Sequence, residues 1–128
     1  MQITRFEDVE SWKVARILTR ELYSATKPAV WNEDRDLKRQ IRKASVSIMA
    51  NIAEGFDGGT DKEFRRYLRI AWRSTTEIQS HLYVALDQEY IIKSAFDALY
   101  RRASDVKGLI GGFIRYLNRS SKTSRSKK

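Results

Sequence analysis

The sequence predicts an all-α protein, an antiparallel up-and-down four-helix bundle followed by a disordered basic C-terminal tail. Four long segments each carry apolar residues at steps of three and four, the spacing that places them on one face of an α-helix. The 128 residues include one proline, so the helices can run long without breakers. Amphipathic helices joined by short connections favour antiparallel packing around a single core.

The first helix is expected from about Asp8 to Thr26, with Asp8 as the N-cap and Pro28 just beyond the end. The second is expected to start within Asp34–Asp36 and to end at Gly55, because glycine suits a left-handed C-cap. The two core stripes are Val9, Trp12, Ala15, Leu18, Leu22 and Ala25, and Leu37, Ile41, Ala44, Ile48 and Ile52.

The third helix is expected to begin after Thr60, which forms a capping-box pattern with Glu63, and to end near Asp87. The fourth helix is expected to open at Ser94, and its apolar residues follow a strict heptad spacing. The two core stripes are Phe64, Leu68, Ala71, Thr75, Ile78, Leu82 and Ala85, and Phe96, Leu99, Ala103, Val106, Ile110, Phe113 and Leu117.

The charge of the chain is the first functional indication. Lys and Arg outnumber Asp and Glu by 25 to 16, which gives a net charge of +9. Residues 119–128 contain five of these positive charges and no acidic or apolar residue. We therefore expect residues 1–118 to form the bundle and residues 119–128 to form a disordered tail. Such a tail adds affinity for polyanions, or it only keeps the chain soluble.

Two basic ridges are expected on helix faces that point away from the core. Four cations of the second helix recur at i, i+3, i+4 and i+7, and four of the third, beginning at Lys62, recur at i, i+4, i+7 and i+11. Ordered ridges can meet phosphates along a nucleic-acid backbone, and the alternative is a solvated helix face. The candidate nucleic-acid-binding residues are Arg35, Lys38, Arg39, Arg42, Arg66, Arg69 and Arg73, with Arg119, Lys122 and Arg125 in the tail.

A second apolar stripe on the second helix predicts self-association. Val46, Met49, Ala50 and Ala53 lie on the side away from the core stripe, and one core does not explain a helix that is apolar nearly all round. Small residues there would let another helix approach closely, and exposed apolar surface marks interfaces. The alternative is a wide bundle core.

Four polar residues near the middle of the bundle are expected to form a structural network. Asn51 and Glu54 flank the core stripe of the second helix, and Ser74 and Glu77 lie on the third. Because buried polar groups must be paired, hydrogen bonds among them would fix the helix register. The alternative is a ligand or metal pocket that uses Glu54 and Glu77, although two carboxylates without His or Cys make a thin ligand set.

Catalytic constellations are mostly missing from the sequence. There is no cysteine, and the single histidine, His81, has no Glu three residues before it to form a Glu-x-x-His metal motif. Seven residues separate Arg73 from His81, which is too many for the Arg-and-His motif of one class of helical ribonucleases. We expect no enzyme, cofactor or metal, and a nuclease or metal enzyme around Glu54, Glu77 and His81 is the most distant alternative.

The sequence gives no indication of a membrane or of base-specific binding. Its first ten residues lack a signal-peptide pattern, and no apolar stretch approaches the ~20 residues needed to span a bilayer, so we expect a cytoplasmic protein with no membrane partner. Trp72 and Tyr83 suit packing between helices better than stacking on bases.

Two segments of the second helix carry a family resemblance. LKRQIRKASVSI at residues 37–48 and NIAEG at residues 51–55 resemble the signature of the four-helix-bundle proteins encoded in intervening sequences of bacterial 23S ribosomal RNA genes. The likeness covers about residues 6–117. Met49 stands where relatives often carry Pro, Arg73 stands where Gly is common, and Asp57-Gly58-Gly59 lacks a usual basic residue. Other matching residues are Phe6-Glu7-Asp8, Trp12, Ala15, Glu63-Phe64, Tyr67-Leu68, Ile70-Ala71, Ser74 and Glu77.

This resemblance implies a compact bundle that assembles into a ring-like homopentamer, makes contact with nucleic acid and has no enzymatic activity. A related branch of the family serves as accessory subunit to the reverse transcriptase of diversity-generating retroelements. The sequence therefore leaves two kinds of partner besides the chain itself. One is an RNA or DNA backbone, and the other is an acidic protein such as a polymerase subunit.

Overall fold

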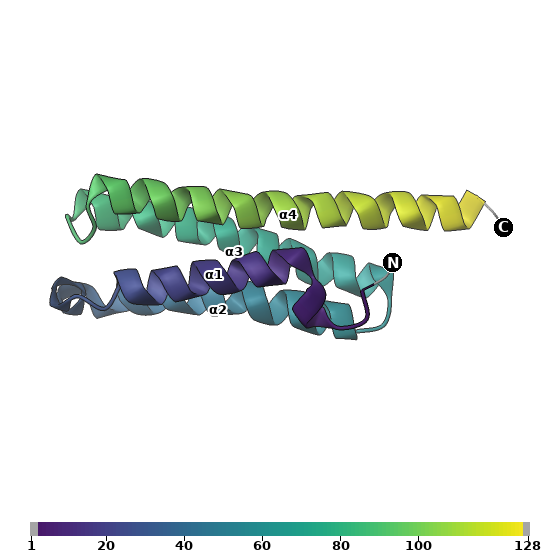
Figure 1. Cartoon of the computed structure of the whole chain (residues 1–128), viewed down its shortest axis with the longest axis horizontal. Coiled ribbons are helices and arrows are strands. Elements are labelled where there is room, and N and C mark those ends of the chain that lie inside the picture. Colours follow the sequence, from purple (N-terminus) through teal and green to yellow (C-terminus); the bar gives the residue numbers. More distant parts are fainter. Residues whose placement is uncertain (1–2, 127–128) are drawn as a thin grey trace.

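The protein is a four-helix bundle in a computed structural model that describes residues 3–126, with side chains described for residues 3–120. Its helices run up and down in turn, each beside its neighbour in the sequence, and the last returns beside the first (Figure 1). This confirms the predicted all-α, up-and-down four-helix bundle. The elements are η1 (Phe6–Asp8), α1 (Glu10–Ala25), η2 (Ala29–Asp34), α2 (Arg35–Asp57), α3 (Asp61–Asp87) and α4 (Lys93–Ser126), where η marks a 3-10 helix.

The core lies between the four helices, on the stripes that the spacing predicts. Every predicted core residue of α2 and α3 is buried. The stripes of α1 and α4 are buried too, except for Trp12, Ala25 and Phe113, which are half-buried against the core. Four amphipathic faces therefore close on one another and leave the polar faces outside.

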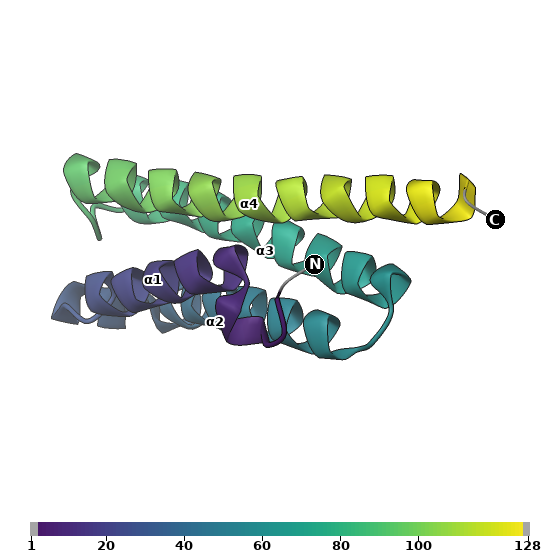
Figure 2. The ribbon, with the colours of Figure 1, turned by 45° about the vertical axis from the view of Figure 1, so that its right-hand side comes forward.

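Helix α4 extends beyond the predicted end of the bundle. It is continuous to Ser126, whereas the sequence predicts a disordered tail from residue 119. The sequence contains no Gly or Pro after Gly112, so no breaker stops the helix. At 1.5 Å per residue its 34 residues span about 51 Å, and its last turns project past the other helices (Figures 1 and 2). The side chains of Lys122 and Arg125 lie outside the described residues.

The starts of the helices differ in their capping. Asp34 caps α2, because its carboxylate accepts a hydrogen bond from the Leu37 amide at 3.1 Å. The Thr60 hydroxyl caps α3 by accepting from the Glu63 amide at 3.2 Å, as the capping-box pattern predicts. Asp8 does not cap α1, since it ends the 3-10 helix η1, and Val9 is the N-cap residue, which has no side-chain oxygen to accept a bond.

Gly55 lies inside α2 rather than at its C-cap, which corrects the prediction. The helix continues to Asp57, and the left-handed conformation that the turn requires is found at Gly59, with φ of 92°. A Cβ atom on Gly55 would lie 2.6 Å from the Cβ atom of Tyr67. Gly55 is therefore needed for the close approach of α3 to α2, and not for a turn.

The connection between α1 and α2 contains a core residue that helical periodicity does not reveal. Trp31 in η2 is 1% exposed, and its ring centroid lies 5.3 Å from that of Tyr90 in the α3–α4 connection. The two aromatic rings cover one end of the bundle. The predicted loop of residues 27–33 thus supplies part of the core.

Candidate nucleic-acid interface

The first basic ridge lies on the N-terminal half of α2. Arg35 and Arg39 are exposed and Lys38 is half-buried, with its ammonium 3.5 Å from the amide oxygen of Asn32. Arg39 forms a 2.6 Å ion pair with Asp36. Hydrogen bonds from Arg39 and Gln40 lower the pKa of the Asp36 carboxyl, so the carboxylate stays charged and offsets part of the ridge.

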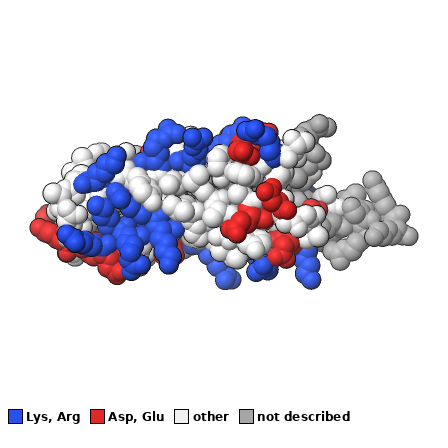
Figure 3. All heavy atoms as spheres, turned by 90° about the horizontal axis from the view of Figure 1, so that it is seen from below, with Lys and Arg blue, Asp and Glu red and all other residues white. Residues whose placement is uncertain are grey.

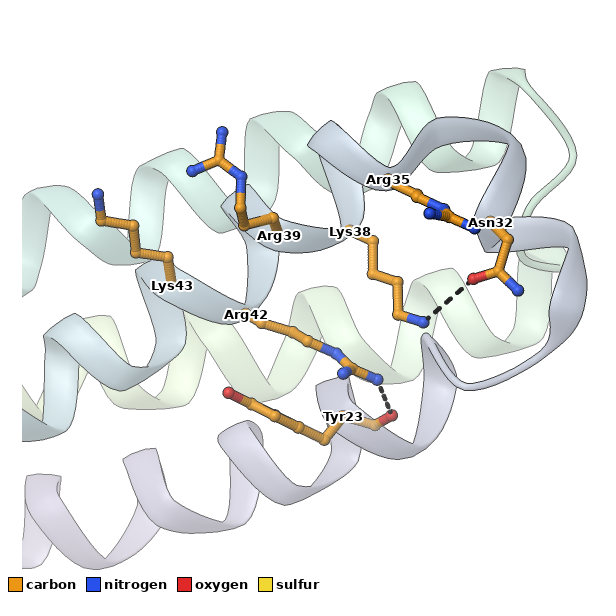
Figure 4. Close-up of a pocket in the computed structure, with 7 residues that line it drawn as sticks. All are labelled: Tyr23, Asn32, Arg35, Lys38, Arg39, Arg42 and Lys43. Carbon is orange, nitrogen blue, oxygen red and sulfur yellow. Dashed lines mark hydrogen bonds between the residues drawn. The ribbon is translucent and has the colours of Figure 1, made fainter.

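These side chains surround an open depression of about 580 Å³ between α2 and the end of α1 (Figure 4). The sequence does not predict three of its lining residues, Tyr23, Asn32 and Lys43. Lys43 follows Arg42 in the sequence, so its place beside the ridge could have been predicted. Tyr23 and Asn32 lie on other elements, and only the fold brings them to the depression. The depression combines cationic groups with an aromatic ring and an amide, which suits an anionic ligand.

Arg42 differs from the rest of the first ridge because it points to α1 (Figure 4). Its guanidinium donates to the Thr26 hydroxyl at 2.8 Å and to the Tyr23 carbonyl at 3.1 Å. It also lies 4.5 Å from the centroid of the Tyr23 ring. Arg42 therefore ties α2 to the C-terminal end of α1. A contact between this residue and phosphate stays a prediction.

The second basic ridge lies on the N-terminal half of α3, and all four of its residues are exposed. Arg66 forms a 2.7 Å ion pair with Glu63, which lowers the pKa of Glu63 and raises that of Arg66 through their mutual hydrogen bond. Arg69 and Arg73 make no ion pair with any described side chain of residues 3–120. Their charges are thus available to an external anion.

Basic side chains cluster at one end of the face formed by α1 and α2. Figure 3 views the molecule from this side, and Lys and Arg gather over the end where α1 stops and α2 begins, with some Asp and Glu at its tip. A second group of Asp and Glu lies toward the opposite end, with Lys and Arg at the edges around it. An anionic partner would therefore be attracted most strongly to the basic cluster.

The predicted self-association stripe lies on the outer side of α2, next to α1. Val46 is 46% exposed and Ala50 is exposed, whereas Met49 and Ala53 are half-buried and Met49 packs against the core. Val46 and Ala50 are therefore available as surface. Met49 and Ala53 fit, in part, the alternative of a wide bundle core. The role of the stripe as an interface stays a prediction.

The four polar residues do not form one hydrogen-bonded network. The Asn51 amide donates to the carbonyl and hydroxyl of Ser47 at 2.8 and 3.1 Å, and the Ser74 hydroxyl lies 3.4 Å from the same Ser47 hydroxyl. Glu54 is exposed and has no hydrogen bond or ion pair to a described side chain. Glu77 lines a hollow together with Ser47 and Ser74, but its side-chain partner is His81, at 3.3 Å.

The residues of the distant enzyme alternative are thus not gathered at one point. Among the described residues no three His, Asp or Glu side chains lie close enough together to hold a metal ion. Trp72 and Tyr83 lie at the α3–α4 boundary and are 39% and 51% exposed. The Lys107 ammonium lies 4.1 Å from the Trp72 ring centroid. Tyr83 packs against Phe96, with centroids 4.9 Å apart.

The fold and this surface define a class of protein, a helical bundle that carries basic ridges on its outer helix faces. No helix within residues 3–126 is both long and apolar enough to cross a membrane. The sequence pattern of the family described as 23S rRNA-intervening sequence protein matches residues 7–112. The chain belongs to this family, as the resemblance of residues 37–55 predicts.

A solved structure from the S23 ribosomal protein family of Bacteroides thetaiotaomicron has the same fold. That protein is described as having unknown function. It is 19% identical in sequence to this chain and superposes with a TM-score of 0.75. The match covers 82% of this chain and 95% of that one. A comparison with curated proteins gave no match.

Proposed function

We propose that this protein is a non-catalytic, cytoplasmic, oligomeric module that binds RNA or DNA backbones through its basic helix faces. The observation that carries the proposal is the exposed ridge of α3, on which Arg69 and Arg73 lack ion-pair partners among the described residues. Arg35 and the depression beside it add a second cationic surface on α2. Rigid helices hold these charges at fixed spacing, so several phosphates can be neutralised at once.

The bound sequence should matter little for this interaction. The aromatic side chains near the α3 ridge are engaged within the chain. The Tyr67 ring centroid lies 4.8 Å from the Arg66 guanidinium, and Trp72 and Tyr83 make contacts with α4. Without a stacking platform or base-edge contacts, affinity would come mainly from release of counterions. The family name supplies the context of ribosomal RNA, and RNA is therefore the first ligand to test.

Titration of a fluorescent single-stranded RNA across a series of salt concentrations tests the proposal. We expect weak binding whose log K falls linearly with log salt, at about −0.7 per neutralised phosphate. A scrambled RNA of equal length should bind equally well. Absence of binding at low salt would reject the nucleic-acid function.

Self-association forms the second part of the proposal. The exposed part of the α2 stripe, formed by Val46 and Ala50, supports it, and the resemblance carried by residues 37–55 implies a homopentameric ring. Val46→Asp tests it better than Met49→Asp, because Val46 is exposed while Met49 also packs against the core. A wild-type chain that is monomeric by light scattering at micromolar concentration would reject this part.

The alternative function is a protein–protein scaffold or an accessory subunit of a nucleic-acid enzyme such as a reverse transcriptase. The depression on α2 favours it, because several cations converge there on a concave surface that also fits acidic side chains. An acidic protein partner would bind at this end of the bundle, and the RNA titration would then show no binding.

A further inference from the structure

A groove between the start of α1 and the middle of α4 is a second apolar surface of the bundle. It has a volume of about 370 Å³, and among its lining side chains Leu109 and Tyr116 are 37% and 41% exposed. This groove is separate from the α2 stripe, because the stripe borders the other side of α1. The groove is lined in part by Ser11, Gly108, Leu109, Gly112, Phe113 and Tyr116.

The glycines of the groove have no explanation inside the chain. A Cβ atom on Gly108 would meet nothing within 4 Å, and one on Gly112 would meet only the end of the Arg115 side chain, at 3.8 Å. Glycine within a helix costs about 1 kcal/mol relative to alanine. Gly108 and Gly112 lie one turn apart on the same face of α4. Because both residues lack a side chain, they let the backbone of another chain approach α4 closely.

Ser11 supplies an independent sign that the groove is incomplete. Its hydroxyl is buried, the residue is 2% exposed, and the oxygen has no hydrogen-bond partner among the described residues. Buried polar groups are normally paired, and leaving one unpaired is unfavourable. Because Ser11 lines the groove, a chain that occupies the groove could supply the missing partner.

We propose that the α1–α4 groove receives the α2 stripe of a second copy of this chain, an inference that rests on the proposed self-association. The small residues Ala50 and Ala53 on the stripe match the glycines of the groove, so the two helices can approach closely. Two different surfaces meet in such a contact, which is therefore heterologous and generates a ring when its rotation closes.

The charged residues that line the two surfaces differ in sign. Arg16 and Arg20 line the hollow of about 390 Å³ that contains Val46 and Met49, whereas Glu10 lines the groove, with Arg115 beside Gly112 at its edge. Glu10 and Arg20 form no ion pair with a described side chain. Stripe-to-stripe pairing would bring Arg16 and Arg20 of both copies together, which costs affinity. Stripe-to-groove pairing instead places Glu10 of one copy near Arg16 or Arg20 of the other.

Cross-linking tests the inference directly, because the chain contains no cysteine. One preparation carries Ala50→Cys, a second carries Gly112→Cys, and a short bismaleimide links thiols that lie close together. We expect cross-linked dimers when the two preparations are mixed and allowed to exchange subunits, and almost none when either is treated alone. A chain with both cysteines should give a ladder that ends at the number of copies in the ring.

The matched control places the cysteine at Ala98, which is exposed on α4 and lines a different hollow four turns from Gly112. Mixing Ala98→Cys with Ala50→Cys should give no dimers. Gly112→Leu, which fills the groove, should make the protein monomeric in sedimentation while its circular dichroism and melting temperature stay those of a folded bundle. Ala98→Leu should leave the oligomer intact.

Several results would overturn the inference. They are efficient cross-linking of Ala50→Cys alone, equal cross-linking through Ala98→Cys, or an unchanged oligomer in Gly112→Leu. If Gly112→Leu fails to fold, the mixing experiment decides by itself. A monomeric wild-type chain would reject the proposed self-association as well, whereas an oligomeric wild type without Ala50–Gly112 cross-links would reject only this groove.

Discussion

Gly55 and Gly108 are both helical glycines, but their surroundings predict opposite effects of adding a methyl group. Gly55→Ala should lower the free energy of unfolding, because its Cβ atom would lie 2.6 Å from the Tyr67 Cβ atom and force α3 away. Gly108→Ala should raise the stability of the single bundle by up to about 1 kcal/mol, because the new methyl group meets open space.

Urea denaturation measures this pair of substitutions. Both should be made in a Val46→Asp chain, since removing self-association keeps the oligomer from contributing to the measured stability. Stabilisation by Gly55→Ala would contradict the close approach of α2 and α3.

Arg42 and Arg69 look equivalent in the sequence, but the structure gives them different roles. Arg42→Ala should lower the free energy of unfolding by about 1–3 kcal/mol, because it removes charge-assisted hydrogen bonds to Tyr23 and Thr26. Arg69→Ala should change it by less than about 0.5 kcal/mol, because Arg69 is exposed. Thermal denaturation of the two variants gives the comparison, and equal losses would contradict it.

At the level of helices, the sequence predicts most of what the structure contains. The 3.6-residue period predicts all four helices, and their predicted core stripes are buried or half-buried, because burying an apolar face is what stabilises each helix. Features that depend on a partner element are not predicted. Gly55 depends on Tyr67, and the burial of Trp31 depends on the two connections meeting at one end of the bundle. Neither leaves a periodic signal.

The candidate site was predicted to a smaller extent. Helical spacing predicts that both ridges lie on outer helix faces. The exposure of Arg35, Arg39 and the α3 ridge confirms this position. Spacing alone does not show that Arg42 reaches across to α1, because that depends on where α1 ends. The extension of α4 through residues 119–126 was also missed, because polar composition says little about a segment that continues an existing helix.

The α3 ridge should contribute to RNA affinity in proportion to its free charges. Arg69→Glu is expected to weaken binding by several-fold and to make log K depend less steeply on log salt. The matched control is Arg101→Glu on α4, which reverses another exposed arginine, in a hollow lined by Glu21, Asp97 and Asp105. This control should have a smaller effect. An equal effect of both variants would mean that net charge, and not the ridge, determines affinity.

For the whole molecule, oligomerisation should multiply a weak contact. Each chain carries a net charge of +9, and several chains on one RNA bind as a unit with a high effective concentration. Val46→Asp should therefore weaken binding to a long RNA far more than binding to one that spans a single bundle. Fluorescence titration measures the affinity for both RNA lengths in the wild type and in the variant. If Val46→Asp weakens binding to both RNAs by the same factor, oligomerisation does not contribute to the affinity.

Helix α1 is held unevenly along its length. At its C-terminal end Arg42 bonds to Tyr23 and Thr26, and the Arg102 guanidinium contacts the Glu21 carboxylate at 3.0 and 3.3 Å. At its start there is no side-chain cap, and Ser11 lacks a partner within the described residues.

This asymmetry has a consequence for local unfolding. Native-state hydrogen exchange should show the amides of residues 14–17 opening at a lower free energy than those of residues 20–23. The bundle would then loosen from the end that borders the groove. Subunit contact at the groove would slow exchange most at the start of α1, where Glu10 and Ser11 line the groove.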